Sequence, residues 1–147
     1  MTTLIWRRLA LGLLSIIAAA LVTGCEEKKP TETNDPSKWT FRKVSGDSQS
    51  VIVWDTLAHR MVVELKDGLK KPIEDEQIRF EVVDGNGMVM SKPVVAASPS
   101  EALMPTDWQG QAAATFQCFD TGQSVIEVKV VSRPELIVQF SVTGVQP

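Results

Sequence analysis

The sequence predicts an all-β domain over residues 39–147, built as an antiparallel β-sandwich of about seven strands. Three observations favour this fold. Val, Ile and Thr dominate this part of the chain, its segments alternate apolar and polar residues, and turn-forming residues separate the segments. Strands with one apolar and one polar face are typical of two antiparallel sheets packed face to face.

The alternation predicts strands, in chain order, at 61–66, 78–85, 111–119, 125–131 and 136–142. The side chains predicted to face the core are Met61, Val63, Leu65, Ile78, Phe80, Val82, Ala112, Ala114, Phe116, Cys118, Ile126, Val128, Val130, Val138, Phe140 and Val142. The residues between them, with Glu64 as one example, are predicted to face solvent.

Turn signals separate these strands. They are KDGLKKP (66–72), DGNG (84–87), TDWQG (106–110), DTGQ (120–123) and SRP (132–134). Residues 91–105 contain three prolines and alternate only weakly. This stretch is therefore predicted to be a long loop with at most a short edge strand at 93–97.

The first 24 residues have the pattern of a signal peptide. Arg7 and Arg8 precede residues 9–22, which are 14 residues without a charge. A helix needs roughly 20 apolar residues to span a bilayer, so this run is too short to be a transmembrane helix and fits a signal-peptide core. The small or compact residues Val22, Thr23 and Gly24 then lead directly into Cys25.

This ending resembles the lipobox of bacterial lipoproteins. In that family, signal peptidase recognises the residues before the cysteine and cuts there, and the cysteine receives a diacylglycerol and usually a further acyl chain. The resemblance implies that Cys25 becomes the lipidated first residue of the mature protein. Two or three acyl chains anchor a protein stably, at about 0.8 kcal/mol per buried CH₂. The alternative is an ordinary secretory signal followed by a chance cysteine.

Residue 26 is Glu. In enterobacterial lipoproteins an Asp at that position tends to hold the protein at the inner membrane, so the sequence resembles the outer-membrane class. We expect the protein on the outer membrane, on its periplasmic face more than on the cell surface. Residues 25–38 comprise the lipidated cysteine and a polar segment with two prolines, which is predicted to be a flexible, disordered tether.

A set of short motifs in residues 39–147 carries a further resemblance. In order, they are VSGDSQ (44–49), a predicted strand that ends in Lys66 and Asp67, Pro72–Ile73, IRF (78–80), TDWQGQA (106–112) and FSVTG (140–144). Their order and spacing resemble the bacterial Ig-like group 1 domain, the module repeated in invasin and intimin. The resemblance implies an Ig-like antiparallel β-sandwich and brings no catalytic residue.

The motif residues have predicted structural roles. Gly46 and Gly110 occupy turns where a residue without Cβ can adopt a positive φ, and Asp67 and Asp107 can cap turns by accepting backbone hydrogen bonds. Lys70 departs from the family, which usually has Gly there. We expect Gly68 to adopt the positive φ instead. Because this chain has one such domain, the reach and repeat-based adhesion of invasin-type proteins cannot be carried over.

The chain offers little for catalysis. His59 is the only histidine, no Gly-x-Ser-x-Gly motif occurs, and no spacing predicts a zinc site. The acidic run 74–76 lacks the pattern of a calcium loop and is interpreted as a solvated turn, with calcium binding as the alternative. We expect no enzyme activity, metal or cofactor. Basic residues are scattered, so nucleic acid is not expected as a partner.

Cys118 and the tryptophans are the remaining candidates. Cys118 is predicted to lie in the core, the alternative being a thiol that pairs with another chain. Trp39 or Trp54 could be a core tryptophan of the sandwich. Trp108 lies inside a turn, which leaves two interpretations open: it packs over the end of the sandwich, or it contacts a partner. The apolar stretch containing Leu103 and Met104 is the other candidate contact surface.

The sequence therefore favours a lipid-anchored, non-enzymatic protein-binding or structural module of a cell-envelope assembly. Its membrane contact would be the N-terminal lipid, and its partner an envelope protein. The alternative is a surface-exposed, adhesin-like lipoprotein of the invasin type. An enzyme or a small-ligand carrier is less favoured, because no small-molecule pocket is predicted.

Overall fold

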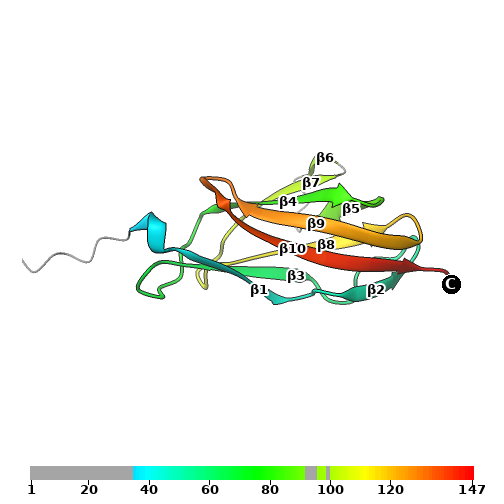
Figure 1. Ribbon diagram of the computed structural model, residues 1–147, viewed down its shortest axis with the longest axis horizontal. Coiled ribbons are helices and arrows are strands. Elements are labelled where there is room, and N and C mark those ends of the chain that lie inside the picture. The colour runs from blue at the N-terminus through cyan, green and yellow to red at the C-terminus, as the bar shows by residue number, and fades with distance from the viewer. Residues whose placement is uncertain (1–34, 92–95, 99) are drawn as a thin grey trace, which may run out of the picture. The chain divides into compact units, whose positions relative to one another are not determined.

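The computed structural model describes residues 35–91, 96–98 and 100–147. These residues form two sheets, shown in Figure 1. The first sheet has the order β1 (Thr40–Ser45), β3 (Met61–Lys66), β8 (Gln111–Cys118) and β5 (Gly87–Met90). The second has the order β2 (Gln49–Ile52), β10 (Arg133–Val145), β9 (Gly122–Val130), β4 (Gln77–Asp84), β7 (Glu101–Pro105) and β6 (Ala96–Ser98). The predicted all-β sandwich is confirmed.

The core lies between the sheets, as the alternation predicted. All the side chains predicted to face inward are buried except Val82 and Val138, which are partly buried and pack against the same core. Phe80, Phe116 and Phe140 are the largest fully buried side chains. They come from β4, β8 and β10, so aromatic rings from both sheets fill the centre.

The described residues form ten strands, where the sequence predicted about seven. The additional strands are short, and β2, β5 and β6 have four residues or fewer, too few to show an alternation. β7 corrects a prediction, because residues 91–105 were expected to be mainly loop. Its backbone pairs with β4 from Pro105 to Glu101, and the prolines of this stretch hid the alternation. The predicted edge strand at 93–97 lies partly outside the described residues.

The turn motifs act as predicted. The Asp67 carboxylate accepts hydrogen bonds from the backbone amides of Leu69 and Lys71, both at 2.8 Å. Asp107 does the same for Gln109 and Gln111 at 2.8 and 2.9 Å. Gly46 and Gly110 have φ angles of 90° and 73°, in the region where a Cβ is strained.

The expectation for Gly68 was wrong, because Lys70 itself adopts the positive φ, at 63°. The backbone explains this outcome. The Lys70 amide donates to the Asp67 carbonyl at 3.0 Å, and the Asp67 amide donates to the Lys71 carbonyl at 2.9 Å, so the turn closes across position 70. Gly68 is needed for a different reason: a Cβ there would lie 2.7 Å from Cβ of Lys38.

Two charged side chains form hydrogen bonds with backbone groups of β10 at the edge of the second sheet. β2 pairs in parallel with β10 only from Val142 to Val145. Just before that stretch, the Ser141 amide donates to the Asp47 carboxylate at 3.0 Å, and Lys43 Nζ donates to the Gln139 carbonyl at 2.9 Å. Lys43 and Asp47 also form an ion pair. Charged residues that occupy the hydrogen-bonding groups of an edge strand disfavour pairing with another chain.

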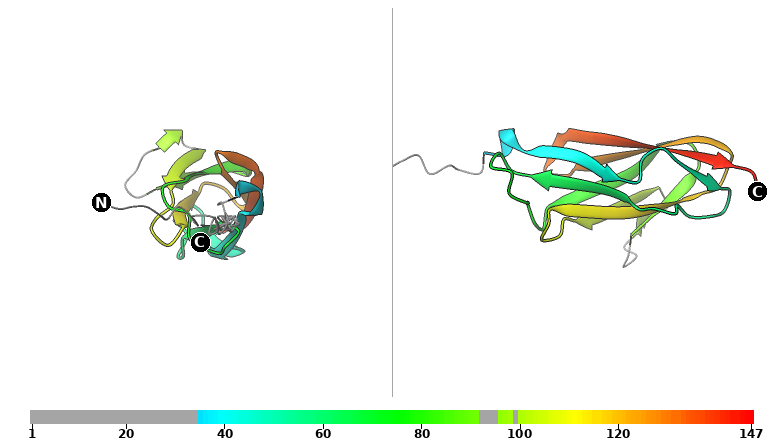
Figure 2. Two further views of the ribbon diagram at one scale, coloured as in Figure 1. Left: turned by 90° about the vertical axis from the view of Figure 1, so that its left-hand side faces the viewer. Right: turned by 90° about the horizontal axis from the view of Figure 1, so that it is seen from below.

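The two ends of the domain consist of different segments of the chain. A short 3-10 helix, η1 (Pro36–Lys38), lies at the N-terminal end, together with loops 67–76, 106–110 and 131–132 (Figure 1). The C-terminus lies at the opposite end, as the right view of Figure 2 also shows. No helix within the described ranges is long and apolar enough to cross a membrane.

Candidate functional site

An exposed aromatic pair lies on the segment that joins β2 to β3, residues 53–60. The side chain of Trp54 has 68% of its surface exposed, and its ring centroid lies 5.2 Å from that of Phe119. The Trp54 amide donates to the Cys118 carbonyl at 2.7 Å, and Gln117 Nε2 donates to the Trp54 carbonyl at 2.8 Å. The backbone is therefore fixed while the indole ring faces solvent.

Two further exposed apolar side chains belong to the strand ends nearby in the chain. Ile52 and Val145 are exposed by 43% and 38%, and they are partners in the pairing of β2 with β10. The amide of the next residue, Val53, donates to the Val145 carbonyl at 3.0 Å. We call Ile52, Trp54, Phe119 and Val145 the aromatic patch. The ends of β2 and β10, which carry Ile52 and Val145, lie toward the C-terminal end of the domain (Figure 2).

The backbone at Trp54 is strained. Its φ angle is 73°, which costs about 1–2 kcal/mol for a residue with a side chain. The exposed indole recovers little of this energy by burial. Among the described non-glycine residues with positive φ, the other three are Ser48, Lys70 and Asp75, so Trp54 is the large apolar one. Strain that folding does not require tends to persist at functional sites.

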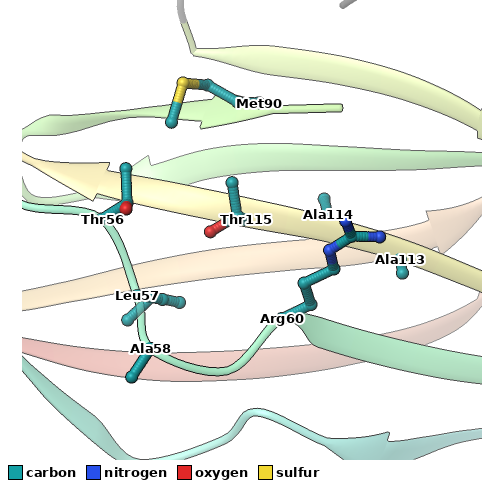
Figure 3. A pocket seen from close by; sticks show the side chains of 8 residues that line it. All are labelled: Thr56, Leu57, Ala58, Arg60, Met90, Ala113, Ala114 and Thr115. Atoms are coloured by element: carbon teal, nitrogen blue, oxygen red, sulfur yellow. The ribbon is translucent and has the colours of Figure 1, made fainter. Parts of the chain in front are cut away.

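A shallow hollow lies over β8, between segment 53–60 and β5. Its volume is about 310 Å³, and it is lined by Thr56, Leu57, Ala58, Arg60, Met90, Ala113, Ala114 and Thr115. Figure 3 shows the Arg60 side chain reaching toward β8 at Ala114, with Met90 on the far side. The small side chains of β8 leave this face uncovered, so the hollow can receive a side chain of a partner.

The glutamine of the VSGDSQ motif holds this segment in place. Gln49 Nε2 donates to the carbonyls of Gly46 and His59, both at 2.8 Å, and the His59 amide donates to Gln49 Oε1 at 3.0 Å. A Cβ at Gly46 would lie 2.2 Å from the Arg60 carbonyl oxygen. The motif therefore positions segment 53–60 against the β1–β2 turn.

Ion pairs neutralise the outer face of the second sheet. Arg79 Nε lies 2.6 Å from Glu101, and Lys129 Nζ lies 3.3 Å from both Glu81 and Glu127. The hydrogen bond that Arg79 donates to Glu101 raises the pKa of Arg79, and those that Lys129 donates to Glu81 and Glu127 raise the pKa of Lys129. These cations stay charged and partnered, so this face is a less suitable binding surface than the aromatic patch.

Glu64 corrects a prediction, since it was expected to face solvent. Only 7% of its surface is exposed, because Arg42 at 2.7 Å and Lys66 at 3.0 Å cover its carboxylate. Burial opposes ionisation, but hydrogen bonds from Lys66 and Arg42 outweigh it and hold the Glu64 pKa below its ordinary value. Within the described ranges, no group of three or more His, Cys, Asp or Glu side chains could hold a metal ion.

The residues predicted as partner contacts lie apart. Trp108 is 73% exposed in the loop at the N-terminal end. Leu103 is half-buried on the outer face of β7, and Met104 packs against the core. The lipidation site Cys25 and the recognition residues Val22, Thr23 and Gly24 are outside the described residues.

The structure also separates the tryptophans. Trp39 is partly buried and packs against the core, whereas Trp54 does not. Cys118 is fully buried, as predicted, and its thiol lies 2.9 Å from the Asp120 carbonyl. The Trp54–Phe119 pair was not predicted from the sequence. The available signal was that VWDT (53–56) follows the last alternating residues of β2, so its tryptophan belongs to a connection.

Neither the protein-family models nor the curated proteins include a match to this sequence. Solved structures do match. The D00-D0 domain of intimin superimposes with a TM-score of 0.53 at 15% identity, over 72% of this chain and 46% of that one. Domains 4 and 5 of the S-layer protein SbsC give a TM-score of 0.50 at 18% identity, over 72% and 44%.

The fold is that of an intimin-type Ig-like domain. This confirms the predicted resemblance at the level of the fold. Invasin, described as a bacterial integrin-binding protein, also matches, with a TM-score of 0.49 at 20% identity over 77% of this chain. The chain covers less than half the length of each of these solved chains, 46%, 44% and 20% respectively.

Proposed function

We propose that this protein is a lipid-anchored, non-enzymatic binding module of a bacterial cell envelope, and that it contacts a partner protein through the aromatic patch. Cys25 would carry the lipid after cleavage behind Val22, Thr23 and Gly24. The protein would lie on the periplasmic face of the outer membrane. The VSGDSQ motif would serve the fold by holding the binding segment in place.

The observation that carries this proposal is the exposed Trp54 ring paired with Phe119. Large aromatic side chains at a protein surface are typical interface hot spots, because they bury much apolar area and lose little conformational freedom. Here the ring is presented on a backbone fixed by hydrogen bonds to the neighbouring strand. Such a site is organised before binding, which lowers the entropic cost of association.

The chemistry around the patch supports binding. The patch supplies apolar surface, and the backbone groups of Trp54 are already hydrogen-bonded to the protein. The hollow lined by segment 53–60 and β8 adds one cation, Arg60, whose guanidinium can pair with a carboxylate of the partner. A surface-layer protein shares the fold, so the fold is compatible with a role in the envelope.

Copurification tests the binding site. Partner proteins would be recovered from solubilised envelopes with the wild type, with Trp54→Ala and with Trp108→Ala. The last variant is the matched control, because it removes an equally exposed tryptophan from the opposite end. We expect Trp54→Ala to lose a protein that Trp108→Ala retains. Equal recovery with both variants would refute the assignment of the patch.

Two further measurements test the anchor and the location. Cys25→Ala should move the protein from the membrane fraction to the soluble fraction, and metabolic labelling with palmitate should disappear. External protease should spare the protein in intact cells and digest it after the outer membrane is permeabilised. Digestion in intact cells would instead favour the surface-exposed, adhesin-like alternative.

A further inference from the structure

The N-terminal end of the domain presents an apolar side chain from each of three loops. Leu69, Trp108 and Val131 are exposed by 40%, 73% and 50%. They belong to loops 67–76, 106–110 and 131–132, which follow β3, β7 and β9 respectively. Loops at the end of a sandwich are ordinarily polar, so one exposed apolar residue on each of three neighbouring loops is unusual.

Backbone hydrogen bonds tie loop 106–110 to loop 67–76, and loop 131–132 to the first residue of β4, which directly follows loop 67–76. The Thr106 amide donates to the Glu76 carbonyl, and the Val131 amide donates to the Gln77 carbonyl, both at 2.9 Å. A Cβ at Gly110 would approach Pro72 to 3.2 Å. The three apolar side chains therefore stand on one connected end, which we call the apolar tip: Leu69, Trp108 and Val131.

The chain enters the domain at this same end. η1 packs on loop 67–76, since a Cβ at Gly68 would lie 2.7 Å from Cβ of Lys38. Only residues 26–34 separate Cys25 from Asp35. Ten peptide steps span at most about 35 Å when fully extended. An anchor at Cys25 would hold the apolar tip close to the lipid surface.

The charge at this end indicates which lipid surface fits. The basic groups here are Lys38, Lys70, Lys71 and Arg133, and the acidic groups include Asp35, Glu74, Asp75, Glu76 and Asp107. Acidic groups are at least as numerous as basic ones, so anionic head groups gain no net attraction. Tryptophan with neighbouring apolar residues prefers the membrane–water interface whatever the head-group charge.

We infer that the apolar tip docks on a zwitterionic lipid surface, which turns the aromatic patch at the opposite end away from the membrane. This inference rests on the proposed lipid anchor. It also makes Trp108 a lipid contact. From the sequence, Trp108 was expected either to contact a partner protein or to pack over the end of the sandwich.

Fluorescence quenching in vesicles tests the inference. The mature lipoprotein, purified from membranes, would be reconstituted in phosphatidylcholine vesicles containing brominated acyl chains, which quench nearby tryptophans. Cleavage before Cys25 has already removed Trp6 from it. One variant keeps Trp108 alone (Trp39→Phe, Trp54→Phe). The matched control keeps Trp54 alone (Trp39→Phe, Trp108→Phe). We expect brominated lipid to remove most of the Trp108 emission and to leave Trp54 unchanged, in low and high salt alike.

A charged substitution provides a second readout. Val131→Asp should reduce the quenching of Trp108, whereas Val83→Asp, at a similarly exposed position (49%) near the other end, should leave it unchanged. Thermal melting of each variant confirms that it is folded.

The outcomes separate this inference from the anchor. Protein that floats with the vesicles while Trp108 is not quenched would overturn the docking tip and leave the anchor intact. Quenching of both tryptophans would also overturn it, because the domain would then have no preferred end. Quenching only in vesicles with anionic lipid would assign the contact to the lysines and refute the apolar tip. Protein that does not float would refute the anchor and, with it, the docking.

Discussion

Replacing Lys70 by Gly should stabilise this domain. Lys70 has a φ angle of 63° in the turn that Asp67 caps, and its side chain is exposed. A residue with a Cβ in the left-handed region costs about 1–2 kcal/mol, a cost that Gly lacks. The hydrogen bonds that close the turn use the backbone and the Asp67 carboxylate, so the substitution leaves them in place.

Glycine also raises the entropy of the unfolded chain, which opposes the gain by about 0.5–1 kcal/mol. The net stabilisation of Lys70→Gly is therefore about 0.5–1 kcal/mol. Lys71→Gly is the matched control, because it removes the same charge one residue later where φ is not positive. It should destabilise the domain by about 0.5–1 kcal/mol, so the two variants should differ by about 1–2 kcal/mol.

The assay is urea unfolding of residues 25–147 with Cys25→Ser, followed by tryptophan fluorescence. The midpoint should rise for Lys70→Gly and fall for Lys71→Gly with the slope m unchanged. In a thermal melt, a difference of 1 kcal/mol corresponds to about 4 °C for a domain of this size. Equal destabilisation by both variants would refute the argument, since it would mean that no strain is stored at position 70.

Three other predictions follow from named contacts. Asp107→Ala removes the carboxylate that accepts hydrogen bonds from two backbone amides, and it should lower the free energy of unfolding in urea by about 1–2 kcal/mol. Asp84→Ala is the control and should cost less, because the Asp84 carboxylate accepts one hydrogen bond, from the amide of the next residue. The pKa of Glu64 in the folded protein lies below its ordinary value of 4.5, so the wild type should lose stability as the pH falls from 4.5 through that lower pKa. Glu64→Gln cannot titrate, so its acid unfolding curve should lack the contribution of Glu64 to this loss. In the Cys25→Ser background the buried Cys118 thiol should resist a thiol reagent until urea unfolds the domain, and rapid modification of the folded protein would contradict its burial.

The alternation of side chains was sufficient to predict the two-sheet core, because burial of one strand face is a local property of the sequence. It failed for β7, which ends in Pro105 and follows soon after the proline at position 99. Its five residues are stabilised by pairing with β4, a contact that no local pattern records. The same limit applies to Glu64, whose burial depends on Arg42 from a different strand.

The candidate site was less predictable than the fold. Trp54 and Phe119 lie far apart in the sequence and meet because the Trp54 amide pairs with the carbonyl of Cys118. Each residue taken alone suits a core position in a sandwich. The apolar tip was partly predictable, because the sequence alone places Trp108 inside a turn. The sequence does not indicate that Leu69 and Val131 lie at the same end of the domain, since this depends on how the strands are arranged.

Photocrosslinking in living cells tests the central claim most directly. A photoreactive phenylalanine derivative at position 52 would stand at the border of the aromatic patch, and the same group at Ile137, equally exposed on the outer face of β10, would serve as the control. The account predicts one defined protein adduct from position 52, absent from position 137, that disappears when Trp54 is also changed to Ala. No adduct at position 52, or an adduct that persists without the indole ring, would contradict the claim that this protein binds its partner through the aromatic patch.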